Sequence, residues 1–219
     1  MGLKYKCLVF DHDDTVVNST ATIHYPCFVE YLKKRGQFDG VTLDQYFIKN
    51  FEPGFVEMLR QDYRMDDDDI TDETKYWIEY VKDHIPDAYP GIKDIMERQR
   101  SGGGLICVVS HSMKENIVRD YMHNGLPEPD MIFGWDLPRD LVKPAPYSLN
   151  EIMRIFDLEP SDILMIDDLK PGYDMAKSCG VDFAGVGWSY DVPYIESFMR
   201  ENCGLYFKQV SDLSEYLNG

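Results

Sequence analysis

The segment Phe10-Asp11-His12-Asp13-Asp14-Thr15 decides the fold class, because it closes a short apolar run that begins at Tyr5. Such a run is typical of a buried β strand, and alternate side chains of an extended chain share one face. Asp11 and Asp13 should therefore project together from the carboxyl end of this strand, where open parallel sheets bind their ligands. Two carboxylates this close repel each other unless a cation or a shared proton lies between them. The pattern predicts a magnesium site that also supports nucleophilic and acid/base chemistry, although an isolated Asp-x-Asp is usually a solvated turn.

Later apolar runs of strand length alternate with helical patterns. A capping box at Ser112–Glu115 predicts a helix that ends near Asn124, and another helix is expected over Pro171–Cys179. Strands that alternate with helices indicate a parallel sheet covered on both faces. We therefore predict an α/β fold with a parallel, Rossmann-like sheet flanked by helices. The strands expected after the first are Leu105–Val109, Met131–Phe133, Ile163–Ile166 and Phe183–Val186.

The interval between the first two strands breaks this rhythm and looks wholly helical. Apolar residues recur at helical spacing, and Thr42–Gln45 is a second capping box. We expect an all-helical cap domain over residues 17–87, inserted after the first strand of a catalytic core formed by residues 1–16 and 88–219. Its hinges should lie near Val16–Ser19 and Pro86–Gly91. Tyr46, Phe47 and Phe51 could be the core of the cap or line the substrate site.

The charge balance narrows the possible partners. The 219 residues hold 39 acidic and 22 basic side chains, for a formal net charge of −17. This charge opposes binding to nucleic acid or to an anionic membrane surface, so neither is expected as a partner. Five widely spaced cysteines without a CxxC pair suit reduced thiols in the cytoplasm. No signal peptide or membrane span is evident, and we expect a cytoplasmic monomer or homodimer.

Three further polar groups follow the pattern of the first strand. Ser110 ends the second expected strand, and Asp167-Asp168 ends the fourth. Lys143 stands in a proline-rich loop before a helix and could supply the positive charge that an acidic site lacks. Each feature alone would be an ordinary cap, turn or surface lysine. Together, they place a hydroxyl, a lysine and four carboxylates near one edge of the sheet.

In this order, the motifs resemble those of the haloacid dehalogenase superfamily. Asp11-His12-Asp13-Asp14-Thr15 is similar to its first motif, Ser110 to the second, Lys143 to the third and Asp167-Asp168 to the fourth. Two stretches, Tyr89-Pro90-Gly91 and Asp167-Asp168-Leu169-Lys170-Pro171-Gly172, also resemble the subfamily whose helical cap follows the first motif. That subfamily includes phosphoglycolate phosphatase-like and β-phosphoglucomutase-like enzymes.

The resemblance implies a Mg²⁺-dependent phosphatase that acts on a small phosphorylated metabolite. Asp11 would be the nucleophile and form an aspartyl phosphate. Asp13 would act as the acid and base, for which an enclosed, acid-rich site should raise its pKa. The metal would be held by Asp11, by the backbone carbonyl of Asp13 and by Asp168, with Asp167 assisting directly or through water.

The resemblance also implies a phosphate site formed by Ser110, His111 and Lys143. Lys143 would in addition restrain Asp11 and counts among the catalytic residues. His12 fills a position that is usually apolar in the family, and it could tune the neighbouring acids or face the cap.

Several alternatives stay open at this stage. Asp13 argues against a dehalogenase, since an alkyl halide needs no proton from a carboxyl group. A phosphosugar mutase would use a cap histidine, and His24 is one residue away from the expected spacing. A catalytically silent member would bind a metabolite without turning it over. A signalling receiver domain carries similar groups in a different order and is the weakest alternative.

Overall fold

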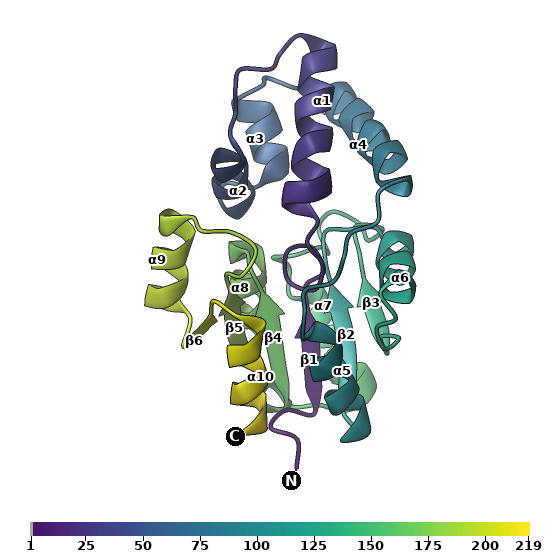
Figure 1. Cartoon of the computed structure of the whole chain (residues 1–219), viewed down its shortest axis with the longest axis vertical. Coiled ribbons are helices and arrows are strands. Elements are labelled where there is room, and N and C mark those ends of the chain that lie inside the picture. The colour runs from purple at the N-terminus through teal and green to yellow at the C-terminus, as the bar shows by residue number, and fades with distance from the viewer. Residues whose placement is uncertain (1) are drawn as a thin grey trace.

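The computed structural model describes residues 2–219, and it contains one six-stranded sheet in the order β3-β2-β1-β4-β5-β6 (Figure 1). All five pairs of neighbouring strands are parallel, which confirms the predicted α/β class. β1 lies between β2 and β4, so the residues that follow these three strands meet at one edge of the sheet. The strands are β1 Cys7–Phe10, β2 Leu105–Val109, β3 Met131–Phe133, β4 Ile163–Asp167, β5 Asp182–Val186 and β6 Leu205–Phe207.

Alternation along β1 builds two apolar layers. Leu8 and Phe10 belong to a cluster on one face, whereas Cys7 and Val9 belong to a cluster on the other. The first cluster includes residues of α5 Ile92–Ser101, α6 Lys114–His123 and α10 Val210–Asn218. The second includes residues of α7 Tyr147–Phe156, α8 Lys170–Cys179 and α9 Pro193–Asn202. Burial on both faces explains why the strands read as continuous apolar runs.

Four α-helices and one turn of π-helix form a separate layer beyond the carboxyl edge of the sheet (Figure 1). They pack around their own aromatic cluster, which includes Phe28, Tyr46 and Tyr63. The predicted capping box at Thr42 is present, because its side chain accepts from Gln45 N and Gln45 caps it in return. The elements are η1 Thr20–His24, α1 Tyr25–Arg35, α2 Leu43–Phe51, α3 Phe55–Gln61 and α4 Asp67–Lys82.

Two chain segments connect the helical layer to the sheet, and they run side by side. Val17 and Ala88 form an antiparallel bridge. Asn18 N donates to Asp87 O at 2.9 Å, and Tyr89 N donates to Val16 O at 2.9 Å. We propose that these paired segments are the hinges, with the domain boundaries at residues 17 and 87.

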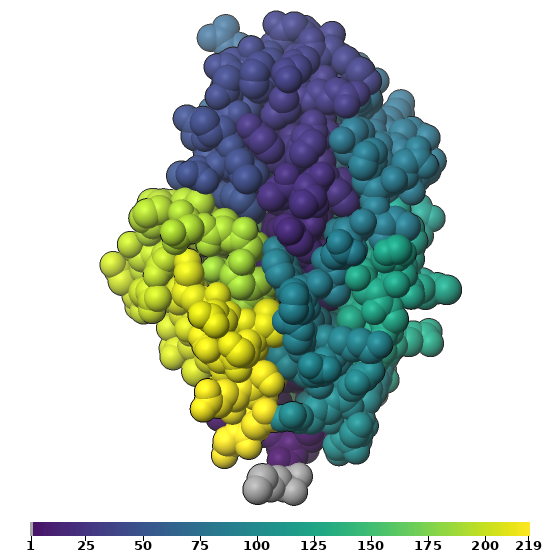
Figure 2. Space-filling view, in the orientation of Figure 1, coloured from purple at the N-terminus to yellow at the C-terminus, as the bar shows by residue number. Residues whose placement is uncertain are grey.

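Helix α2 also packs against the sheet-bearing part of the chain. Phe47 and Phe51 belong to the apolar cluster of α7, α8 and α9, whereas Tyr46 belongs to the cap cluster. The Phe47 ring lies 4.6 Å from the Tyr190 ring, and the Phe51 ring lies 5.1 Å from that of Phe198. In the space-filling view, the cap lies directly against the chain around α9 (Figure 2). Phe47 and Phe51 therefore join the two layers. The sequence had suggested only that they form the core of the cap or line the substrate site.

The sequence missed the C-terminal part of the fold. Strand β6 and helices α9 and α10 extend the sheet and its cover beyond the last predicted strand. β6 is a half-buried strand of three residues, too short for a periodic pattern to identify it. Within residues 2–219, no helix is both long and apolar enough to cross a membrane.

Candidate active site

The ends of three neighbouring strands bring the predicted groups together. Asp11 follows β1, Ser110 follows β2, and Asp167 is the last residue of β4. In the sheet register, Phe10 pairs with Val108 on one side and with Ile166 on the other. The three polar positions therefore share one edge, directly below the helical cap.

Lys143 links two of these carboxylates. Its Nζ donates to Asp11 Oδ1 at 2.7 Å and to Asp167 Oδ2 at 2.7 Å, and all three side chains are buried. Burial alone would lower the pKa of Lys143, but the two carboxylates raise it well above its ordinary value. The ammonium group therefore stays charged and fixes one Asp11 oxygen in place.

Asp11, Asp167 and Asp168 form a cluster suited to a metal ion. One oxygen from each carboxylate lies within 4.8 Å of the others, and the three residues are at most 4% exposed. Burial raises the pKa of Asp11 to about 7, and it raises the pKa of Asp168 well above its ordinary value, with Asp14 and Asp11 adding to the effect. Hard oxygen donors with excess negative charge fit Mg²⁺. The Asp13 carboxylate is outside this cluster, so only its backbone carbonyl is available for the ligand role that the resemblance implies.

Asp14 and Thr15 lie beside the acidic cluster, and neither was predicted to have a role of its own. Asp14 has a positive φ of 60°, and this turn lets its N–H donate to Val17 O at 2.8 Å. Burial raises the pKa of Asp14 to about 6. Thr15 Oγ1 donates to Asp168 Oδ1 at 3.3 Å. The loop after β1, which carries the first motif, thus folds back on itself. Through Thr15, it also donates a hydrogen bond to Asp168, a proposed metal ligand that follows β4.

Asp13 turns away from the metal cluster and accepts three side-chain hydrogen bonds. Ser19 Oγ and His24 Nε2 approach Oδ1 at 2.7 and 2.9 Å, and Ser112 Oγ donates to Oδ2 at 2.6 Å. Burial would raise the pKa of Asp13, but His24 and the hydrogen bonds hold it well below its ordinary value. The expectation of a raised pKa was therefore wrong for this closed arrangement, because it did not include these donors.

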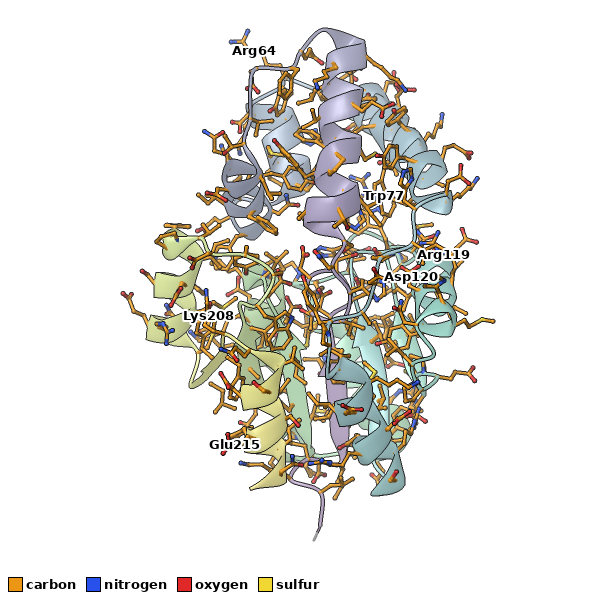
Figure 3. All side chains as sticks on the ribbon, viewed as in Figure 1. Arg64, Trp77, Arg119, Asp120, Lys208 and Glu215 are labelled. Atoms are coloured by element: carbon orange, nitrogen blue, oxygen red, sulfur yellow. The ribbon has the colours of Figure 1, made fainter. Side chains whose placement is uncertain are left out.

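His24 reaches Asp13 from the cap despite the one-residue offset in sequence. Trp77 on α4 donates its indole N–H to His24 Nδ1 at 3.0 Å. An indole can only donate, so Nδ1 accepts and the ring hydrogen lies on Nε2, which faces Asp13. Trp77 lies at the junction of the two layers (Figure 3). The contact was missed because η1 is a π-helix, whose spacing differs from that of an α-helix.

The loop between β2 and α6, which carries Ser110, does not form the predicted capping box. The cap of α6 is Met113, without a side-chain cap bond, and Asp136 Oδ2 accepts from Lys114 N at 2.9 Å. The predicted capping box at Ser112 was wrong, because the Ser112 hydroxyl is used by Asp13. Ser112 N donates to Ser110 Oγ at 3.1 Å, which leaves the Ser110 O–H free to donate to a ligand.

His111 supports the lysine loop with its side chain. Its Nε2 lies 3.0 Å from the carbonyl oxygen of Lys143, so this nitrogen must carry a hydrogen and donate. Burial, together with the charge of Lys143, lowers the pKa of His111 to about 4. The imidazole is therefore neutral near pH 7 and brings no positive charge to a phosphate group.

Two further residues position the carboxylates of β4. Tyr190 donates its hydroxyl to the backbone carbonyl of Asp168 at 2.6 Å, and its ring contacts Phe47 of the cap. Gly172, near the start of α8, leaves room for Asp167: a Cβ there would lie 2.2 Å from Asp167 Oδ2. Sequence alone gave no signal for Tyr190, whereas Gly172 ends the stretch Asp167–Gly172 that resembles the capped subfamily.

Comparison with known proteins agrees with this geometry. The haloacid dehalogenase-like hydrolase family matches residues 8–186, a stretch that contains most of β1, all of β2 to β5 and the whole cap. The chain therefore belongs to this family of hydrolases.

Among relatives, a phosphoglycolate phosphatase of Haemophilus influenzae (strain 86-028NP) is 26% identical over 118 residues, which cover 52% of each chain. A phosphoglycolate phosphatase of Vibrio vulnificus (strain CMCP6) is 23% identical over 141 residues, which cover 64% of this chain and 58% of the relative. The chain spans about half the length of the Haemophilus relative that it matches.

Solved structures share the whole fold. A crystal structure described as a haloacid dehalogenase-like hydrolase from Bacteroides fragilis has a TM-score of 0.81 at 21% identity and covers 96% of this chain and 100% of its own. A predicted phosphoglycolate phosphatase from Haemophilus somnus 129PT has a TM-score of 0.78 at 19% identity, with coverage of 97% and 98%. At these identities, the likeness establishes the fold.

Gly172→Ala tests how tightly the site is built. Alanine is more favourable than glycine within a helix, but its methyl group would displace the Asp167 carboxylate from Lys143. We expect a loss of hydrolase activity of roughly 100-fold, as for a catalytic group moved by about 1 Å. The matched control is Lys177→Ala on the exposed face of α8. Unchanged activity in Gly172→Ala would show that the position of Asp167 matters little.

The stability of the metal-free protein should depend on pH through Asp11. Its folded-state pKa, about 7, exceeds the ordinary value of 3.8, so the folded protein binds more protons between those values. The free energy of unfolding should therefore fall as pH rises from about 4 to about 7. Because Mg²⁺ binds the ionised carboxylates, it should restore this stability. We expect Mg²⁺ to raise the melting temperature more at about pH 8 than at about pH 5. Equal shifts at both pH values would contradict the carboxylate site, and Asp168→Asn should abolish the difference.

Proposed function

We propose that the chain is a Mg²⁺-dependent phosphatase that hydrolyses a small phosphomonoester through an aspartyl phosphate on Asp11. The observation that carries this proposal is the buried contact of Lys143 with both Asp11 and Asp167, beside Asp168. In phosphoryl transfer, the main contributions of the protein are to position the reacting groups and to neutralise the charge on the phosphoryl oxygens. A fixed carboxylate next to a lysine and a set of metal ligands meets both requirements.

The residues would divide the work as follows. Asp11 Oδ2, the oxygen without a bond to Lys143, attacks phosphorus while the bond from phosphorus to the leaving oxygen breaks. Lys143 and the free Ser110 hydroxyl would bind the phosphoryl oxygens, while His111 would hold the Lys143 backbone in place. Mg²⁺, held by Asp11, Asp168 and the Asp13 carbonyl with help from Asp167, would neutralise charge on the transferred group.

Asp13 would handle the protons of both half-reactions. In the closed structure, it is ionised and suited to take a proton from the water that hydrolyses the aspartyl phosphate. To act first as an acid, it must gain a proton. A leaving group that enters between Asp13 and His24 would remove one donor, raise the pKa of Asp13 and thereby allow this.

The enclosure of the site favours small substrates. Asp11, Asp167 and Asp168 are nearly inaccessible beneath the cap, so only a compact phosphoester could be enclosed with them. The named relatives act on phosphoglycolate, and a phosphoglycolate-like ester or a sugar phosphate fits this size class. A cytoplasmic location and a monomeric or homodimeric state stay predictions.

Asp11→Asn is the direct test of this function. With Mg²⁺, the wild-type protein should release phosphate from an aryl phosphate or from members of a phosphometabolite panel. The amide cannot form the aspartyl phosphate, so turnover should fall at least about 1,000-fold while the fold is retained. Asp94→Asn, at an exposed position on α5, is the charge-matched control. A wild-type protein without any turnover would favour the silent metabolite-binding alternative.

A phosphosugar mutase is the second candidate, and one observation favours it. His24, the cap histidine considered for a mutase, contacts the proposed acid/base Asp13 directly at 2.9 Å, although its position in the sequence is one residue away from the expected spacing. Product analysis separates the two functions: a phosphatase releases inorganic phosphate, whereas a mutase returns an isomeric sugar phosphate. If His24→Gln removed isomerisation while phosphate release persisted, the mutase assignment would be supported. Phosphate as the only product would exclude it.

A further inference from the structure

The cap covers the site, so contacts between the cap and the sheet-bearing core must hold it in this closed position. The carboxylates of Asp11, Asp167 and Asp168 are covered, so a substrate can reach them only after the cap has moved. The hinge segments themselves are joined by backbone hydrogen bonds near Val17 and Ala88. These bonds join the segments to each other and include none to α6, the helix that packs beside the first-motif loop.

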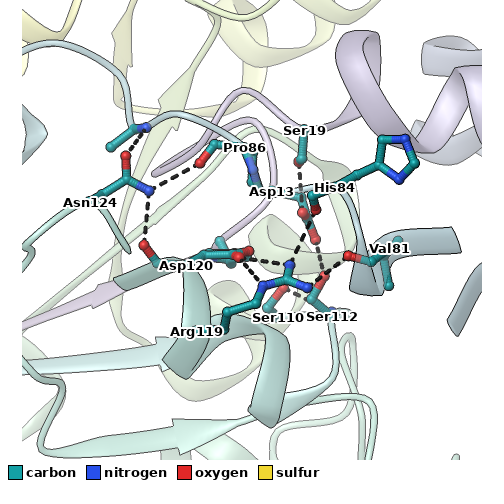
Figure 4. A network of polar contacts seen from close by, with 12 residues as sticks. Asp13, Ser19, Val81, His84, Pro86, Ser110, Ser112, Arg119, Asp120 and Asn124 are labelled. Carbon is teal, nitrogen blue, oxygen red and sulfur yellow. Dashed lines mark hydrogen bonds and ion pairs between the residues drawn. The ribbon is translucent and has the colours of Figure 1, made fainter. Parts of the chain in front are cut away.

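Arg119 on α6 contacts the end of the cap helix α4. Its Nη1 donates to Val81 O at 2.7 Å, and its Nη2 lies 3.4 Å from His84 O (Figure 4). The last carbonyls of a helix lack partners within the helix, and its carboxyl end attracts a cation. One side chain of the core thus caps a helix of the helical domain.

The same guanidinium group is also connected, through Asp120, to the loop after β1 that carries Asp11 and Asp13, which we call the catalytic loop. Arg119 Nε donates to Asp120 Oδ1 at 2.8 Å, and His12 Nε2 lies 3.0 Å from the other oxygen, Oδ2. His12 and Asp120 are 1% and 3% exposed. A carboxylate that is ionised can only accept, so His12 donates to it. His12 stands between Asp11 and Asp13, and it faces α6 instead of the cap.

Asn124, the residue that follows the last residue of α6, connects the second hinge segment to the same helix. Its amide donates to Pro86 O at 3.0 Å and to Asp120 O at 2.8 Å, and its oxygen accepts from Ala88 N at 2.8 Å. Figure 4 shows the Arg119 and Asn124 contacts on either side of Asp120. One face of α6 therefore contacts the cap helix, the hinge and the catalytic loop.

We propose that Arg119 is a positioning residue: through Asp120 and His12 it couples the closed position of the cap to the geometry of the loop that carries Asp11 and Asp13. The inference rests on the proposed function for its catalytic consequence, while the coupling itself is a property of the fold. The forked guanidinium group suits this role because its N–H groups, fixed in one plane, reach backbone carbonyls of the cap and a carboxylate of α6 at once, whereas a lysine offers a single compact charge on a flexible stem.

Amide hydrogen exchange in Arg119→Met tests the coupling without an assay of activity. The amides of Val16 and Val17 both donate to His12 O, at 2.9 and 3.1 Å, and they report on the junction between the loop after β1 and the first hinge segment. Arg119 makes no contact with either amide. We expect both to exchange at least about fivefold faster in Arg119→Met, together with the amides of residues 81–89. Arg154→Met, which removes an exposed arginine paired only with Glu151, is the control and should change neither segment.

Faster exchange confined to residues 81–89 would overturn the proposal, because Arg119 would then be a local cap of α4. Arg119→Lys keeps the charge without the fork and should give an intermediate effect in both segments. If Arg119→Met does not fold, this variant decides the question, and wild-type exchange at Val16 and Val17 would again overturn the proposal.

Kinetics then connect the coupling to catalysis. With a phosphoester that the wild type turns over, Arg119→Met should lower kcat roughly tenfold, and Arg119→Lys should recover part of the loss. If the wild type turns over no phosphoester, the proposed function fails while the exchange experiment still tests the coupling. If exchange in the loop is unchanged but the wild type is active, the coupling fails and the function stands.

Discussion

The bridge from Lys143 to Asp11 and Asp167 is the interaction on which the site depends. Four carboxylates, those of Asp11, Asp14, Asp167 and Asp168, are buried within the same small region, and Lys143 offsets only part of their charge. Buried charges of one sign are costly unless they are paired. The raised pKa values of Asp11 and Asp14 reflect this cost, and a divalent cation is the partner that would relieve it.

The fold creates this concentration of charge from segments far apart in the sequence. The order of the strands places β1 between β2 and β4, so the proposed catalytic positions need only follow the ends of apolar strands. The cap inserted after β1 completes the site from above, where Ser19 and His24 reach Asp13. The enclosure of the site and two of the hydrogen bonds to Asp13, the proposed acid/base, therefore come from the same insertion.

The sequence predicted those parts of the site that depend on the ends of strands. Asp11, Ser110 and Asp167 follow buried apolar runs, and parallel pairing alone brings them together. It could not predict contacts made by side chains from distant segments, such as Ser112 with Asp13, Tyr190 with Asp168 or Arg119 with Val81. These depend on loop geometry and on the packing of the cap, neither of which leaves a periodic pattern. The capping-box prediction at Ser112 failed for the same reason: a tertiary partner took the hydroxyl.

A crystal structure with Mg²⁺ and beryllium fluoride, a mimic of a phosphoryl group, would test the central claim most directly. We expect the fluoride adduct on the Asp11 oxygen that does not contact Lys143, within hydrogen-bond reach of Ser110 and Lys143. We also expect the metal between Asp11 and Asp168. An adduct on another residue, or a metal bound away from these carboxylates, would contradict the assignment of Asp11 as the nucleophile.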